Sequence, residues 1–221
     1  MWISPFSPRL AARLLVFAGL TLAFGLGVSP ASAEEAGWLR VSERDGIEVH
    51  ARSVHGSDVK EVKATTVIDA PPARVFEVLL DWKRFVEFMP YIVEVREVAR
   101  ESPTLWYLYQ RISPPLVNER DYTLRHQSVE DPQRGHYELR WDAANDRGPA
   151  AREGTVRIEL CTGSYVVQGL DSGARTQLTY QLYTDPGGAL PTWIANIANR
   201  QSVPALLQAI AHRSKDPGWR R

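Results

Sequence analysis

The feature that most constrains the fold is a long run of alternating residues between Tyr91 and Thr184. Apolar and polar side chains alternate within each segment, and turn sequences such as those at 131–132 and 171–173 separate the segments, as in strands with one buried face. We expect seven strands here: YIVEVREVAR, LWYLYQRI, RDYTLRHQSV, HYELRWDA, TVRIELC, SYVVQGL and RTQLTYQLYT. A meander of this length must curl, and its apolar face requires a cover.

The segments before this run predict three more strands and then helices. WLRVSERDGIEVHARSV indicates a hairpin with Asp45 and Gly46 as its turn, and VKEVKATTVID indicates a third strand. ARVFEVLLDWKRFVEFMP has helical spacing between Pro72, which suits the first helical position, and Pro90, which ends the run. This spacing predicts a helix of about three turns and then a short second helix.

The end of the sequence predicts the cover for the sheet. LPTWIANIANRQSVPALLQAIAHR carries apolar residues three and four apart, which indicates a C-terminal helix of about 20 residues with a kink at Pro204. The predicted fold is therefore α+β: a curved antiparallel sheet wrapped around a long C-terminal helix, with short helices after the third strand. Such a sheet leaves interior space that its side chains do not have to fill.

Residues 1–33 have the pattern of a secretory signal peptide. Basic residues precede an apolar run from Leu14 to Val28, and small residues follow as far as Ala33. The run is shorter than the roughly 20 residues that cross a bilayer. We therefore expect residues 34–221 to form one exported domain, periplasmic or secreted, and a retained N-terminal anchor is the alternative.

Composition excludes several kinds of partner and chemistry. Lys and Arg number 26, as do Asp and Glu, so the charge balance gives no case for nucleic-acid binding. Cys161 is the single cysteine, which rules out an internal disulfide. The five histidines show no metal-ligand spacing, and no hydrolase, metalloprotease or phosphate-loop motif occurs. We expect a monomer with no metal, no cofactor and no catalytic residue.

Three segments resemble the START (steroidogenic acute regulatory-related lipid transfer) domain of the helix-grip, or Bet v 1-like, superfamily. They are VIDAPPARVFEVLLD, PPLVNERDYTL and, most specifically, YTDPGGALPTWIANIANRQSVPALLQAI, and the resemblance spans Trp38 to Arg213. It implies a cavity between the sheet and the C-terminal helix that binds one hydrophobic ligand, commonly a sterol or phospholipid, without a cofactor. The Arg-Asp pair that begins a strand near this cavity in the family corresponds here to Arg120 and Asp121.

Two departures limit what the resemblance implies. The N-terminal helix of many eukaryotic members is absent, because the sequence after the predicted signal peptide goes directly into a strand. The predicted export signal also distinguishes this chain from the cytosolic members of the family. Neither the ligands nor the membrane partners of those members are therefore transferred to this chain.

Side-chain parity and the closing helix select the residues that we expect to line the cavity. The predicted ligand contacts are Trp106, Leu108, Arg120, Tyr122, Leu124, His126, Trp141, Ile158, Tyr180, Trp193, Ile194 and Ile197. Many of these side chains also serve as ordinary core. Together they form a face rich in Trp and Tyr, whose polar tips require partners when buried.

Arg120 admits two interpretations. In the first, its guanidinium ties the start of the strand to a neighbouring carboxylate or loop carbonyl, because its five donors form a rigid fork. In the second, it meets the polar end of a ligand. Asp121 then points outward, or into the bend made by Pro114 and Pro115.

These observations predict a protein that binds a lipid or sterol-like ligand for transfer or sensing, with transient membrane contact. The first alternative is an aromatase- or cyclase-like enzyme acting on a small aromatic or polyketide-like substrate, with His126 as its acid–base group. The second is an interaction module whose interior is filled by its own side chains. For ligand release, we expect the C-terminal helix to swing on the loop Asp185–Gly188.

Overall fold

The computed structural model describes residues 37–115, 117–188 and 192–219. Within α3, the side chains of residues 192–195 and 197–201 are not described. The predicted signal peptide, residues 1–33, lies outside the described residues. No helix in the described ranges combines the length and the apolar character needed to span a membrane.

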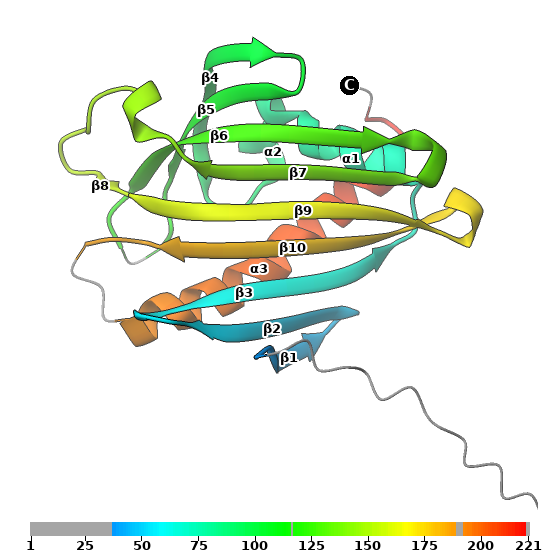
Figure 1. Ribbon diagram of the computed structural model, residues 1–221, viewed down its shortest axis with the longest axis horizontal. Helices are drawn as coiled ribbons and strands as arrows, with labels where there is room; N and C mark the ends of the chain where they lie inside the picture. Colours follow the sequence, from blue (N-terminus) through cyan, green and yellow to red (C-terminus); the bar gives the residue numbers. More distant parts are fainter. Residues whose placement is uncertain (1–36, 116, 189–191, 220–221) are drawn as a thin grey trace, which may run out of the picture. The chain divides into compact units, whose positions relative to one another are not determined.

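One sheet of ten strands forms the body of residues 37–219 (Figure 1). Nine strands follow the order β1-β2-β3-β10-β9-β7-β6-β5-β4, and β8 pairs beside β6. The strands are β1 Leu39–Arg44, β2 Ile47–Val54, β3 Ser57–Ile68, β4 Ile92–Ser102, β5 Leu105–Ile112, β6 Arg120–Asp131, β7 His136–Ala143, β8 Val156–Arg157, β9 Leu160–Leu170 and β10 Arg175–Asp185. All pairs along the nine-strand path are antiparallel.

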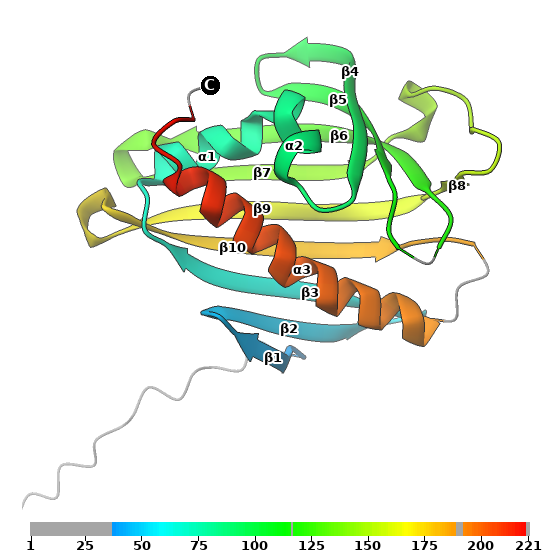
Figure 2. The same ribbon diagram turned by 180° about the vertical axis from the view of Figure 1, so that it is seen from behind.

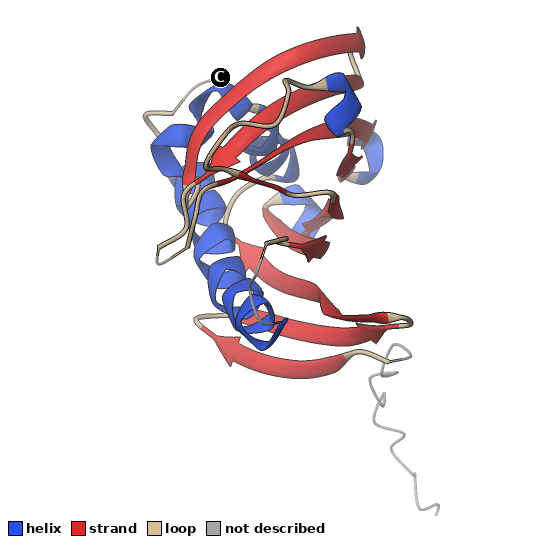
Figure 3. Cartoon of the chain, turned by 90° about the vertical axis from the view of Figure 1, so that its left-hand side faces the viewer, coloured by secondary structure: helices blue, strands red, loops and turns tan. Residues whose placement is uncertain are grey.

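Three α-helices lie on one face of this sheet (Figure 2). They are α1 Pro72–Leu80, α2 Phe85–Phe88 and α3 Thr192–Lys215, and the 3-10 turns are η1 Trp82–Arg84, η2 Pro132–Arg134, η3 Asn145–Arg147 and η4 Asp171–Gly173. The sheet curves around α3, as the side view shows (Figure 3). The predicted α+β helix-grip fold is confirmed.

Local sequence explains the first hairpin and the third strand. Asp45 and Gly46 both have positive φ, 54° and 73°, as the tightest hairpin turn requires, and Arg44 pairs with Ile47 across them. Along β3, alternate side chains from Val62 to Ile68 are buried. The predicted hairpin and the predicted third strand are therefore confirmed, and β3 buries one of its two faces.

The helices follow the predicted pattern with small differences. Pro72 occupies the first turn of α1, whose nine residues make two and a half turns, fewer than expected. α3 has 24 residues and continues through Pro204, while the kink expected there stays a prediction. Val203, Leu207 and Ile210 are buried in the described half of α3, so this stripe packs α3 against the sheet and α1.

The prediction for the strand TVRIELC was wrong. Val156 and Arg157 form a separate short strand, which pairs in parallel with the start of β6. Leu160 and Cys161 already belong to β9 and pair with β10, and Leu160 is 39% exposed. The Thr-Gly-Ser sequence around Gly163 was interpreted as a break, but β9 runs through it without interruption.

β9 contains a glycine at position 163 because Trp141 approaches the strand closely there. A Cβ on Gly163 would lie 2.5 Å from the Trp141 ring and 2.4 Å from the carbonyl oxygen of Gln181. Glycine inside a strand often marks such an approach. Gly163 therefore leaves room for the Trp141 indole beside β9.

Candidate ligand-binding site

The concave side of the sheet contains a cavity of about 490 Å³. Its walls come from β5, β6, β7, β9 and β10, from the segment between α1 and β4, and from the described part of α3. Apolar and aromatic side chains predominate among its thirty described lining residues, which include no Asp, Glu or Lys. Its size is within the range of roughly 300–1,000 Å³ that is usual for small-molecule sites.

Nine of the twelve predicted contact residues line this cavity: Trp106, Leu108, Arg120, Tyr122, Leu124, His126, Trp141, Ile158 and Tyr180. Ile158 reaches the cavity from the link between β8 and β9, and not from a strand of the meander as predicted. Trp193, Ile194 and Ile197 lie in α3, but their side chains are outside the described part. Contact of any of the twelve with a ligand stays a prediction.

Several lining residues were missed by sequence reasoning. Gln110 has the same parity on β5 as Trp106 and Leu108, so the alternation could have identified it. Tyr165 was missed because the predicted strand break at Gly163 interrupted the count. The α2–β4 connection and the pair Pro114 and Pro115 carried no local signal, because only tertiary packing brings them to the cavity.

The Arg-Asp pair at the start of β6 divides between the two faces of the sheet. Arg120 lines the cavity and is 4% exposed. Its Nη1 donates to the carbonyl of Asn118, and no ion pair of Arg120 occurs among the described residues. Burial lowers the pKa of this guanidinium. The carbonyl contact fits the first interpretation of Arg120 and the cavity position fits the second, so both stay open.

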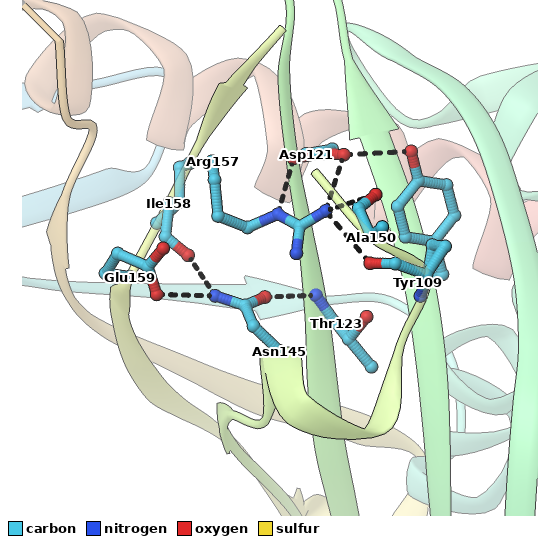
Figure 4. A network of polar contacts seen from close by, with 9 residues as sticks. Tyr109, Asp121, Thr123, Asn145, Ala150, Arg157, Ile158 and Glu159 are labelled. Atoms are coloured by element: carbon cyan, nitrogen blue, oxygen red, sulfur yellow. Dashed lines mark hydrogen bonds and ion pairs between the residues drawn. The ribbon is translucent and has the colours of Figure 1, made fainter. Parts of the chain in front are cut away.

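Asp121 points to the opposite face and is fully buried there (Figure 4). Its Oδ1 accepts from Nε of Arg157 at 2.7 Å, and its Oδ2 accepts from Nη2 of Arg157 at 3.0 Å and from the Tyr109 hydroxyl at 3.1 Å. Hydrogen bonding to Asp121 raises the pKa of Arg157. The same guanidinium donates to the carbonyls of Pro149 and Ala150, so it fixes the loop between β7 and β8.

Asn145 attaches the same loop at a second point. Its Oδ1 accepts from the backbone N–H of Thr123 at 2.9 Å, and its Nδ2 donates to the carbonyl of Ile158 at 2.8 Å (Figure 4). These bonds connect β6 to the residue that enters the cavity. The polar network outside the sheet therefore positions Ile158 inside it.

His126 lies deep in the cavity between two indoles. Its ring stacks on Trp106 with centroids 5.7 Å apart and tilts against Trp141 at 6.5 Å. Burial lowers the pKa of His126 to about 4, so the ring is neutral at pH 7. Its Nδ1 lies 3.2 Å from the carbonyl of Leu124, and a proton placed there leaves Nε2 as an acceptor.

An aromatic cluster continues the wall across β7, β9 and β10. Trp141, Tyr165 and Tyr180 lie with ring centroids 5.0 to 5.8 Å apart. Burial raises the pKa of both tyrosines, so their hydroxyls stay protonated. Burial also raises the pKa of the Cys161 thiol to about 11, which leaves no nucleophilic thiolate at neutral pH.

Phe85 and Met89, at α2, are buried, whereas Trp82 and Phe88 are half-buried. Trp82, Phe85 and Met89 line the cavity. These positions favour packing in the core over exposure at the surface. The described residues contain no group of three His, Cys, Asp or Glu side chains arranged to hold a metal.

Known proteins resemble this chain over most of its length. Residues 68–211 match the family model described as polyketide cyclase / dehydrase and lipid transport. Bovine phosphatidylcholine transfer protein is 25% identical over 178 residues, which are 78% of this chain and 82% of that protein. An uncharacterised protein of Pseudomonas aeruginosa is 29% identical over 160 residues, 72% of this chain and 77% of that one.

A solved structure of a STAR-related lipid transfer protein from Xanthomonas axonopodis superposes with a TM-score of 0.73. It is 27% identical, and the match covers 81% of this chain and 99% of that one. The resemblance to the START domain is thereby confirmed. The chain belongs to the polyketide cyclase / dehydrase and lipid transport family.

Proposed function

We propose that this protein binds one lipid or similarly hydrophobic molecule in the cavity between the sheet and α3, and carries or senses it. The observation that carries the proposal is the cavity of about 490 Å³ with its largely apolar wall. The similarity to proteins named for lipid transfer supports the same conclusion. No metal or cofactor is needed for this activity.

Burial of apolar surface supplies enough free energy for such binding. Each buried methylene contributes roughly 0.8 kcal/mol, so one acyl chain or sterol gains on the order of 10 kcal/mol gross. Immobilising the ligand costs several kcal/mol of this. A remainder of about 6 kcal/mol corresponds to a Kd of tens of micromolar.

Extraction of the native protein tests the proposal. The protein is purified from its own host and extracted with organic solvent, and the extract is analysed by mass spectrometry against the protein concentration. Near-stoichiometric lipid supports carriage. If the purified protein contains no lipid and binds none that is added to it, the result supports the interaction module instead.

A cavity-filling variant locates the binding site. Ile112 lines the cavity and is half-buried, so Ile112→Trp places an indole where the ligand is expected. Val93 is 44% exposed on β4 and does not line the cavity, so Val93→Trp is the matched control. Lipid content should fall for Ile112→Trp alone, and equal content in both variants would place the lipid elsewhere.

An enzyme of the cyclase type is the second candidate. His126 in the cavity wall favours it, because a ring nitrogen that accepts a proton there suits a general base. A pKa of about 4 makes the imidazole a weak base at pH 7, which favours carriage. Turnover of a polyketide-like substrate that is lost in His126→Ala would support the enzyme.

We also propose that residues 1–33 direct export and that the mature protein acts as a monomer outside the cytoplasm. Cell fractionation and intact-mass measurement of the mature chain test both parts of the export proposal. A periplasmic or secreted protein that begins at Glu34 is expected. A full-length mass in a membrane fraction would support the retained anchor instead.

A further inference from the structure

The charge inside the cavity is not balanced. Arg120 is the one formally charged side chain among the thirty described residues of the wall, since His126 is neutral at pH 7. The carboxylates close to Arg120 in the chain have other partners. Glu119 pairs with Arg111, and Asp121 lies on the opposite face with Arg157 and Tyr109.

A buried guanidinium without an anion is costly. Its charge persists at any physiological pH, because arginine does not lose its proton there. The Asn118 carbonyl supplies a dipole but no charge. Buried charges in folded proteins are normally paired. The described wall of this cavity contains no negatively charged side chain that could pair with Arg120.

Two polar side chains that follow Arg120 along the β5–β6 ladder also suit an anion. Gln110 pairs with Tyr122 across β5 and β6, and Arg120 pairs with Ile112 two positions along the same ladder. The Tyr122 hydroxyl donates to Oε1 of Gln110 at 3.3 Å, so the amide oxygen already accepts and the amide NH₂ remains the donor end. Arg120 and Gln110 thus present donors at one end of an otherwise largely apolar wall.

The size of the cavity limits the apolar part of a ligand. A methylene group occupies about the volume of a water molecule, roughly 30 Å³. A cavity of about 490 Å³ therefore holds about 16 such groups. One long acyl chain is therefore the ligand part that best matches this volume.

We propose that the cavity takes a single-chain amphiphile with an anionic end, its head on Arg120 and its chain along the aromatic wall toward His126 and Trp141. This inference rests on the proposed function and names its ligand class. The anionic head is a carboxylate, as in a fatty acid, or a phosphate, as in a lysophospholipid. Both would supply the counter-charge that the described wall lacks.

Binding to the delipidated protein tests this inference with four ligands: oleate, methyl oleate, oleoyl lysophosphatidate and dioleoyl phosphatidylcholine. Oleate should bind roughly 10- to 100-fold more tightly than methyl oleate, because a charge-assisted hydrogen bond is lost in the ester. The relative affinities of oleate and oleoyl lysophosphatidate identify the head. Dioleoyl phosphatidylcholine should bind more weakly than the preferred single-chain anion.

Three variants assign the effect to Arg120. Arg120→Gln should abolish the preference for oleate over the ester, whereas Arg120→Lys should retain part of the preference. Arg125 lies on the same strand, is partly exposed and pairs with Asp142, so Arg125→Gln is the matched control. The wild-type comparison stands by itself if Arg120→Gln does not fold.

The outcomes separate this inference from the proposed function. Equal binding of oleate and methyl oleate to the wild-type protein overturns the anionic class. Tighter binding of the two-chain lipid overturns the single-chain class. Either result leaves lipid binding intact, whereas binding of none of the four ligands counts against the proposed function itself.

Discussion

At the scale of single residues, the alternation of β6 separates two adjacent side chains with opposite tasks. Arg120 faces the cavity, and Asp121 faces a polar network that holds the loop between β7 and β8. Opposite charges next to each other in sequence therefore do not pair. They lie on opposite faces of the sheet because successive side chains of a strand point in opposite directions.

Loss of the Asp121 carboxylate should destabilise the fold. Asp121→Asn removes the anion from a pair whose arginine is only 12% exposed, and we expect a loss of about 3–5 kcal/mol in the free energy of unfolding. Urea denaturation measures it. Asp142→Asn is the control, because its carboxylate is 57% exposed and 3.9 Å from Arg125, so it should change stability by about 1 kcal/mol or less. Equal effects would contradict the assigned role.

His126 should make stability depend on pH. Its folded pKa of about 4 lies below the usual value of about 6.5, so between these values the unfolded chain binds a proton that the folded chain does not. The free energy of unfolding should therefore fall by about 3 kcal/mol as the pH drops through this window. His126→Gln should remove this loss in denaturation measured at pH 7 and pH 4, whereas His55→Gln, at an exposed position, should retain it.

At the scale of elements, α1 holds the C-terminal end of α3. Arg74 of α1 donates to the carbonyls of Ser214, Asp216 and Trp219, and its guanidinium stacks 4.0 Å from the Trp219 ring. The Trp219 indole donates to Asp81 at 2.9 Å. The C-terminal end of α3 is thus fixed to α1. Near the other end, Asn196 accepts from the backbone N–H of Lys60 at 3.1 Å and donates to the carbonyl of Asp58 at 3.3 Å, and these two bonds would break if α3 swung on the loop Asp185–Gly188.

The loop before α3 should control ligand exchange. Gly187 and Gly188 have φ of 64° and 73°, which alanine adopts only with strain. The double variant Gly187→Ala, Gly188→Ala should change the rate of lipid exchange, measured by transfer between vesicles. Gly173→Ala, at a turn with φ of 88° outside this loop, controls for strain alone. An unchanged exchange rate in the double variant would contradict the hinge.

At the scale of the whole domain, stability and occupancy should be coupled. The cavity interrupts the close packing that normally stabilises a core, so the empty domain should unfold more easily than the loaded one. A bound ligand at about 100 times its Kd adds roughly 2.7 kcal/mol. Thermal unfolding of loaded and delipidated protein measures this difference. It should vanish in Ile112→Trp, and an equal Tm for both wild-type forms would contradict the coupling.

Much of the fold and part of the site could be predicted from the sequence, because they depend on local periodicity. The period of two placed Trp106, Leu108, Tyr122, Leu124 and His126 on the face that lines the cavity. The same reasoning failed at Gly163, where a glycine that accommodates Trp141 was interpreted as a turn. A glycine can mark a turn or can make room for a neighbouring side chain, and the sequence does not show which of the two applies.

The sequence by itself determined the order of most elements, the face that β5 and β6 turn toward the cavity and the helix that covers the sheet. Only the tertiary structure decided that Asp121 pairs with Arg157, that Ile158 enters the cavity from a loop and that Arg120 lacks an anion among the described residues. Periodicity is a property of neighbouring residues and is visible locally. Ion pairing and cavity volume depend on contacts between segments that are far apart in the chain. No local sequence pattern shows which of these segments come into contact.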